Sequence, residues 1–185
     1  MVKTSDEIAL MRNSGRLLAS VFEMLDGLDL AGMSTMQIND LVERYITVDL
    51  AARPASKGQY GFEFVLNCSI NEVVCHGVPD PETIVRDGDL INLDITLEKD
   101  GFIADSSKTY VVGNASGAAK RLVRIARDAM WAGIRQVRPG AHLGDIGSAI
   151  EKHAKKNGCS VVREYCGHGI GREMHEDPQV LHYGT

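Results

Sequence analysis

The chain has 185 residues, 44% apolar residues and a formal net charge of −5, values typical of a globular protein with one domain or two small halves. The acidic charge and the lack of a basic run argue against a nucleic-acid partner, and no apolar stretch is long enough to cross a bilayer. The N-terminal segment lacks a signal peptide's uninterrupted apolar core, so we expect a cytoplasmic protein whose four cysteines are reduced and buried.

Two helices are predicted at the start of the chain, over about 5–26 and from a cap at residue 34 to about residue 50. Each begins with a capping box, in which Ser or Thr is followed three residues later by Glu or Gln. Apolar side chains then recur at helical spacing. Two short strands are expected next, over 62–70 and 72–75, before a loop over 76–81 that is rich in Gly and Pro.

The stretch from residue 89 to residue 112 predicts a β-hairpin with Asp-Gly at its turn. If residues 100 and 101 are the two loop residues, Asp105 faces Thr96. Asp94 is two residues from Thr96 and therefore on the same side of its strand. Asp94 and Asp105 are then diagonal neighbours on one face, with Cα atoms about 7–8 Å apart. A loop of odd length would instead put them on opposite faces.

The apolar residues around this aspartate pair mark the hairpin as largely buried. Two close, buried carboxylates repel each other unless a positive group lies between them, and a divalent cation satisfies both. One carboxylate from each strand can bridge two metal ions. The alternative is that one aspartate caps a turn or pairs with an arginine.

Two more helices, over about 117–137 and 143–157, and a strand over 161–165 are predicted in the second part of the chain. An offset of 108 residues aligns these helices with the first two, which indicates an internal repeat. The pseudo-halves would be about 1–113 and 114–185. At the same offset the second hairpin would begin near residue 197, so we expect the second half to be incomplete.

Three of the six histidines lie in glycine-rich surroundings: His76, His168 and His175. A neutral imidazole beside two aspartates is a common divalent-metal set. Each histidine taken alone is more often structural than catalytic. The other three have no such context, and we interpret them as surface or packing residues.

Four motifs together carry a resemblance to a known family. They are SINEVVCHG at 69–77, NLDIT at 92–96, DGFIAD at 100–105 and YCGHGIGR at 165–172. The chain closely resembles the type I, bacterial-type methionine aminopeptidases from its first helix to His182. This resemblance implies an α/β (α+β) pita-bread fold of two pseudo-symmetric αβ halves.

The resemblance also implies the site and its chemistry. Asp94, Asp105 and His168 match metal ligands, and His76 and His175 match two non-ligand histidines near the scissile bond. Phe62 and Met174 match walls of the methionine pocket. The implied cofactors are two divalent ions (Co, Mn, Fe, Zn or Ni), which assist removal of the N-terminal methionine from nascent polypeptides at the ribosome. The complete enzyme is expected to be a cytoplasmic monomer with no nucleic-acid or membrane partner.

The chain departs from the family pattern in its pocket and at its end. Gln59 and Met174 replace the usual aromatic residues of the pocket region. The family's two glutamate ligands would lie beyond Thr185, so we expect little activity from this chain alone, unless Glu164, Glu173 or Glu176 replaces them. The alternative function is that of a non-catalytic pita-bread paralogue that binds a peptide or a protein.

Overall fold

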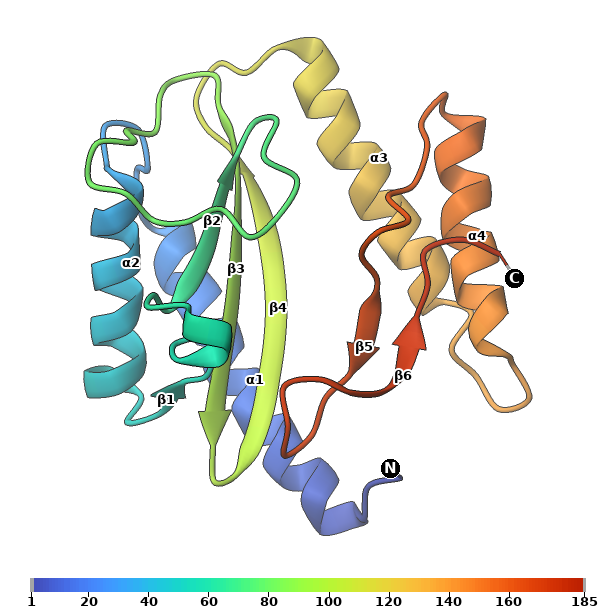
Figure 1. Ribbon diagram of the computed structural model, residues 1–185. Helices are drawn as coiled ribbons and strands as arrows, with labels where there is room; N and C mark the ends of the chain where they lie inside the picture. The colour runs from blue at the N-terminus through green and yellow to red at the C-terminus, as the bar shows by residue number, and fades with distance from the viewer. Residues whose placement is uncertain (1, 185) are drawn as a thin grey trace. The chain divides into compact units, whose positions relative to one another are not determined.

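Two helices followed by strands occur twice along the chain in the computed structural model, which describes residues 2–184 (Figure 1). The chain divides into two units. Met1–Ala115 and Ile170–Met174 form unit 1, and Ser116–Gly169 and His175–Thr185 form unit 2. No helix of the described part of the chain is both long and apolar enough to cross a membrane.

Unit 1 begins with two helices, as the capping boxes predict. Helix α1 spans Ser5–Asp26, and α2 spans Thr35–Arg44. In each, the N-cap hydroxyl accepts a hydrogen bond from the third residue of the helix, whose own side chain bonds back to the N-cap backbone. The predicted end of this second helix, at about residue 50, is confirmed. Its last turn, Tyr45–Asp49, is π-helical, because Leu50 donates its N–H to the Tyr45 carbonyl five residues back.

The antiparallel sheet of unit 1 is organised around its longest central strand, β3. The strands are β1 Arg53–Pro54, β2 Leu66–Ile70, β3 Leu90–Lys99 and β4 Phe102–Val111. Strands β1 and β2 pair with different parts of β3 along one edge, and β4 pairs along the other. The turn between β3 and β4 contains Asp100 and Gly101, both with positive φ, which confirms the predicted two-residue loop.

Two strand predictions before this hairpin are wrong. The expected strand over 62–70 begins only at Leu66, and Val65 just before it donates its N–H to the Asn39 side chain instead of to a neighbouring strand. The expected strand over 72–75 is absent. Asn71 has a φ of 51°, donates its side-chain amide to Asp89 and accepts the N–H of Leu90, which turns the chain away from the sheet.

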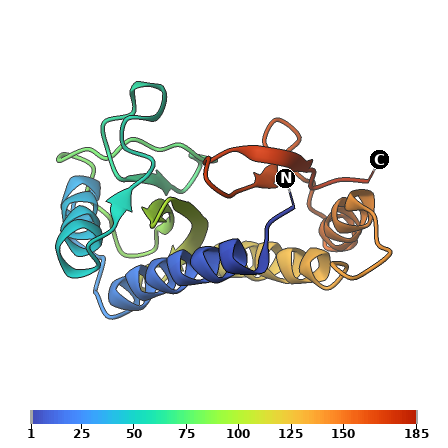
Figure 2. The ribbon, with the colours of Figure 1, turned by 90° about the horizontal axis from the view of Figure 1, so that it is seen from below.

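The sheet is more completely buried on the face that packs against α1 than on the opposite face. Figures 1 and 2 show α1 along the sheet, where its apolar side packs against β3 and β4. On β3, the inward residues Ile91, Leu93, Ile95 and Leu97 are fully buried. The residues between them are mostly polar, and Asp94 is half-buried, as Asp105 is on β4. The hairpin is therefore less buried than expected, and the aspartates lie on its polar face.

Unit 2 contains a helix pair and a small two-stranded sheet. Helix α3 spans Gly117–Ile134, α4 spans Leu143–Lys156, β5 spans Gly167–Gly169 and β6 spans Glu176–Val180. The helices approach closely at Gly133, where an added Cβ would lie 2.8 Å from a side-chain carbon of Ile150. Helix α3 ends three residues earlier than predicted, where i→i+3 bonds tighten its last turn before Pro139.

The strand expected over 161–165 is also absent. Most of that segment is exposed, and the Arg163 side chain bonds to Glu151 and lies over the Tyr183 ring, 4.2 Å from its centroid. Strand pairing begins at Gly167 instead, and continues with His168 opposite Gln179.

The predicted internal repeat is visible in the helix bounds. Helices α1 and α3 end at Asp26 and Ile134, and α2 and α4 begin at Thr35 and Leu143, each pair 108 residues apart. A glycine with a φ near 85° precedes α2 and α4 at corresponding positions, 32 and 140. A left-handed turn therefore introduces the second helix of each pair.

Candidate functional site

The register of the β3–β4 hairpin is the one expected from the sequence. Lys99 pairs with Phe102 and Thr96 pairs with Asp105, while Asp94 pairs with Ser107. Asp94 and Asp105 are therefore diagonal neighbours on the polar face of the sheet. Each comes from the middle of a long, paired strand, which holds its Cα in place before any ligand binds.

The carboxylate of Asp105 is oriented by its cross-strand neighbour. The Thr96 hydroxyl donates a hydrogen bond of 3.0 Å to Asp105 Oδ1, and Thr96 itself is only 4% exposed. Hard divalent cations prefer carboxylate oxygens, and a half-buried pair that already lies on one face fits such an ion. The donor set of unit 1 is therefore chemically suited to a metal.

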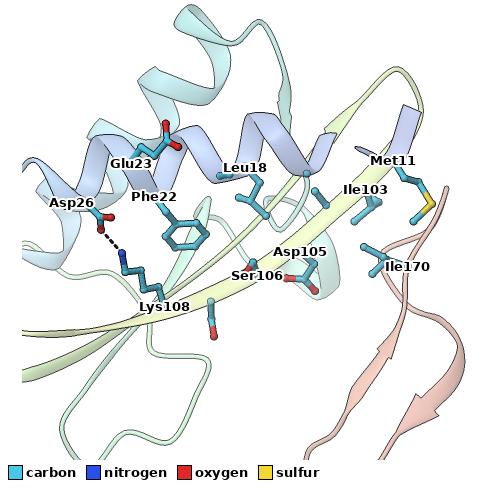
Figure 3. Close-up of a pocket in the computed structure, with 14 residues that line it drawn as sticks. Met11, Leu18, Phe22, Glu23, Asp26, Ile103, Asp105, Ser106, Lys108 and Ile170 are labelled. Carbon is cyan, nitrogen blue, oxygen red and sulfur yellow. Dashed lines mark hydrogen bonds and ion pairs between the residues drawn. The ribbon is translucent and has the colours of Figure 1, made fainter. Parts of the chain in front are cut away.

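Asp105 also lines a groove between α1 and β4, shown in Figure 3. Leu18 and Phe22 of α1 form apolar walls. At one end, Asp26 and Lys108 form an ion pair across the groove, and the hydrogen bond from Lys108 lowers the pKa of Asp26. One aspartate of the candidate site thus borders a mostly apolar groove.

His76 follows β2 in an exposed loop and has a φ of 57°, in the left-handed region. The next residue holds this conformation in place. Gly77 accepts the N–H of Cys68 at 2.8 Å and donates its own N–H to the Ser69 hydroxyl at 3.1 Å. A Cβ on Gly77 would lie 2.2 Å from the Cys68 carbonyl oxygen, so only glycine fits there.

The two residues matched to the methionine pocket both belong to unit 1. Phe62 is half-buried and packs edge-on against Phe64, with ring centroids 5.6 Å apart. Met174 is half-buried at the end of the segment 170–174. That segment is attached to the hairpin, since Ile103 donates its N–H to the Gly171 carbonyl at 2.7 Å.

The other two histidines lie together in unit 2. The rings of His168 and His175 are tilted by 46°, with centroids 4.4 Å apart. His168 Nδ1 lies 3.0 Å from the carbonyl oxygen of Gly169. Because a carbonyl only accepts hydrogen bonds, this contact places the proton on Nδ1 and the lone pair of the neutral ring on Nε2, which is the form that binds a metal.

The predicted site residues therefore fall into two groups. Asp94, Asp105 and His76 belong to unit 1, and His168 and His175 to unit 2. Within residues 2–184, no three His, Cys, Asp or Glu side chains gather closely enough to hold a metal ion. The three-residue ligand set stays a prediction.

The cysteines differ from the expectation that all four are buried thiols. All are free, but only Cys68 is fully buried, and burial raises the pKa of its thiol to about 12. Cys75, Cys159 and Cys166 are half-buried.

Sequence reasoning did not identify the residues that hold the site in place. Thr96 orients Asp105, and Ser69 and Gly77 fix the chain beside His76. The predicted register already sets Thr96 directly opposite Asp105, and the structure adds the hydrogen bond from its hydroxyl. Nothing in the local sequence places Ser69 against Gly77, since the contact depends on how the loop folds back onto β2.

The family model for Metallopeptidase family M24 matches residues 9–185 of the chain. The chain is 46% identical over 184 residues to a methionine aminopeptidase of Escherichia coli strain K12, and the match covers 100% of this chain and 70% of that protein. Among solved structures, methionine aminopeptidase from Rickettsia prowazekii matches with a TM-score of 0.96 and 41% identity, over 100% of this chain and 74% of the other. A prolidase from Pyrococcus furiosus, 20% identical, shares the fold with a TM-score of 0.83, over 99% of this chain and 52% of its own.

Proposed function

This chain belongs to metallopeptidase family M24, and we propose that it removes the N-terminal methionine from newly made polypeptides by metal-assisted hydrolysis. The pita-bread fold predicted from the sequence is confirmed by its structural relatives. The observation that carries the proposal is the register of the β3–β4 hairpin, which sets Asp94 and Asp105 on one polar face. We further place the activity in the cytoplasm, where nascent chains emerge from the ribosome.

Asp94, Asp105 and His168 are the residues that would hold the metal, with two divalent ions at the complete site. The support from this chain is chemical: two half-buried carboxylates on one face, and an imidazole whose Nδ1 faces a carbonyl. When bound, such ions supply a water with a lowered pKa and polarise the carbonyl that is attacked. We propose that each ion is one of Co, Mn, Fe, Zn and Ni in its divalent form.

The chain's own residues would bind and orient the substrate. His76 would hydrogen-bond the amide of the scissile bond, and His175 would donate to the oxygen that gains negative charge. Phe62 and Met174 would line the pocket for the methionine side chain. Met174 lacks the flat face of an aromatic ring, and its flexible thioether suits a wall that adapts to an unbranched substrate side chain.

A peptide assay tests the proposal directly. Purified protein supplied with Co²⁺ or Mn²⁺ is expected to release free methionine from Met-Ala-Ser slowly, because only three of the family's five ligands are assigned in this chain, and to leave Leu-Ala-Ser largely intact. A chelator should abolish the release, and added metal should restore it. Release at the same rate in the presence of chelator would contradict metal assistance, and equal cleavage of both peptides would contradict the methionine pocket.

The same assay separates the non-catalytic alternative. A protein that binds metal and a methionyl peptide in calorimetry, but releases no methionine, would support a peptide-binding paralogue. Retention of Asp94, Asp105 and His168 favours the enzyme.

A further inference from the structure

We propose that Ser69 is a positioning residue for His76, acting through the backbone of Gly77. This inference rests on the proposed function, in which His76 bonds the reacting amide. Ser69 does not touch the substrate in this scheme. Its role is to hold the loop that carries His76 against strand β2.

The contact is built from two hydrogen bonds on neighbouring residues of one strand. The Ser69 hydroxyl accepts the Gly77 N–H at 3.1 Å, and the Cys68 N–H donates to the Gly77 carbonyl at 2.8 Å. Ser69 is 3% exposed and Cys68 is 4% exposed, so water competes little for these groups. Both polar backbone groups of Gly77 are therefore fixed to β2.

This attachment determines the backbone of the preceding residue. His76 has a φ of 57°, which few residues other than glycine adopt without support from their surroundings. Gly77 lies so close to β2 that an added Cβ would lie within 2.9 Å of three backbone atoms of Cys68 and Ser69. With Gly77 fixed, the direction in which the His76 side chain leaves the backbone is also fixed.

The same strand connects His76 to a proposed metal ligand. In the β2–β3 ladder, Asn67 pairs with Asp94 and Cys68 pairs with Leu93. Strand β2 thus holds Gly77 on one side and pairs with the strand of Asp94 on the other. A shift of the loop away from β2 would change the distance between His76 and the carboxylate without disturbing the carboxylate itself.

Ser69→Ala removes the acceptor and leaves the partly buried Gly77 N–H without this partner. The loop is expected to relax, so that His76 no longer meets the reacting amide in the transition state. We expect kcat for Met-Ala-Ser to fall by about 10- to 100-fold, the range for a misplaced catalytic group. KM should change by less than about twofold, because the lost contact forms in the transition state. Ser69→Thr keeps the hydroxyl and should recover most of kcat.

Ser14→Ala is the matched control. Ser14 is fully buried in the same unit, and its hydroxyl donates to the Phe102 carbonyl at 2.9 Å. None of the hydrogen bonds given for this hydroxyl involves the loop that carries His76. This variant should lower the melting temperature as Ser69→Ala does, and it should leave kcat unchanged. Equal losses of kcat in the two variants would show that Ser69 acts only on stability.

Imidazole NMR supplies a readout that does not depend on turnover. The chain has six histidines, and the ring signals of His76 are identified by their loss in His76→Gln. In metal-free protein, Ser69→Ala should shift or broaden the His76 signals and leave those of His153 unchanged, and Gly77→Ala should do the same if it folds. Unchanged His76 signals in Ser69→Ala would overturn the proposal. If the unmodified protein fails to cleave the peptide, the proposed function fails, and the NMR comparison still decides whether Ser69 positions His76.

Discussion

The Thr96 hydroxyl donates to Asp105 Oδ1 at 3.0 Å from the position directly opposite on the neighbouring strand. Thr96 is 4% exposed, so its hydroxyl is shielded from water and its rotamer is restricted. One oxygen of the carboxylate is therefore held in place, which lowers the entropy that Asp105 would lose on binding a cation. Cross-strand pairing thus prepares Asp105 for its proposed role.

Thr96→Val removes this hydroxyl and keeps the shape of the side chain. We expect the affinity for Mn²⁺ to fall by about tenfold, the lower end of the effect of residues that orient a metal ligand. Calorimetric titration measures the change. Undiminished affinity would mean that the hydrogen bond does not orient Asp105 for a metal.

Asp105→Asn tests the ligand itself. Loss of one carboxylate charge should lower Mn²⁺ or Co²⁺ affinity by about 100-fold or more, beyond the loss caused by an orienting residue. The far-ultraviolet circular dichroism of the helices should not change. Asp128→Asn, which removes an exposed charge from α3, is the control and should bind as the parent does. If both variants bind alike, Asp105 is not a ligand.

His76→Ala tests the transition-state role of this histidine. The variant is expected to lower kcat by about 10²–10⁴-fold, the range for a positioned proton donor or acceptor, with bound metal unchanged. Steady-state kinetics and metal analysis of the same preparation give both values. His153→Ala serves as the control on α4. A variant that loses its metal would instead indicate that His76 is a ligand.

Arg172 is expected to fasten the segment 170–174 to the hairpin. Its guanidinium lies 4.4 Å from the centroid of the buried Phe102 ring and 3.4 Å from the Glu7 carboxylate. Arg172→Met should therefore raise amide hydrogen exchange in this segment by about two- to fivefold, the equivalent of one partly exposed cation–π contact. Arg124→Met on the exposed side of α3 should have no effect there. Equal exchange in all three proteins would show that backbone contacts alone hold the segment.

Acid should weaken the attachment of α1 to β4. A hydrogen bond from Lys108 lowers the pKa of Asp26 below its ordinary value of 3.8, so the ionised form is favoured by folding. The resulting stabilisation is present above pH 3.8 and is lost as the pH falls through the lower, folded pKa. Asp26→Asn should reduce the melting temperature by at most about 3 °C at pH 7, because the pair is exposed to solvent. The difference from the parent should shrink as the pH falls below 3.8, and a difference that does not shrink would have another cause.

The sequence by itself determined the helices, the β3–β4 turn and the diagonal placement of Asp94 and Asp105. These features depend on local chemistry: capping boxes begin α1 and α2, Asp-Gly adopts positive φ at a two-residue turn, and pairing then follows by counting residues. The 108-residue repeat was visible for the same reason, since helical periodicity is a local property.

Only the tertiary structure decided where the short strands lie and what supports the site. The run EVVC at 72–75 resembles a strand, but Asn71 bonds to Asp89 and Leu90 from far along the chain and turns it away. Gly77 and Ser69 meet because the loop folds back onto β2, and the rings of His168 and His175 meet across the β5–β6 turn. Each of these contacts joins residues whose proximity depends on the fold, and such contacts leave no periodic signal in the sequence.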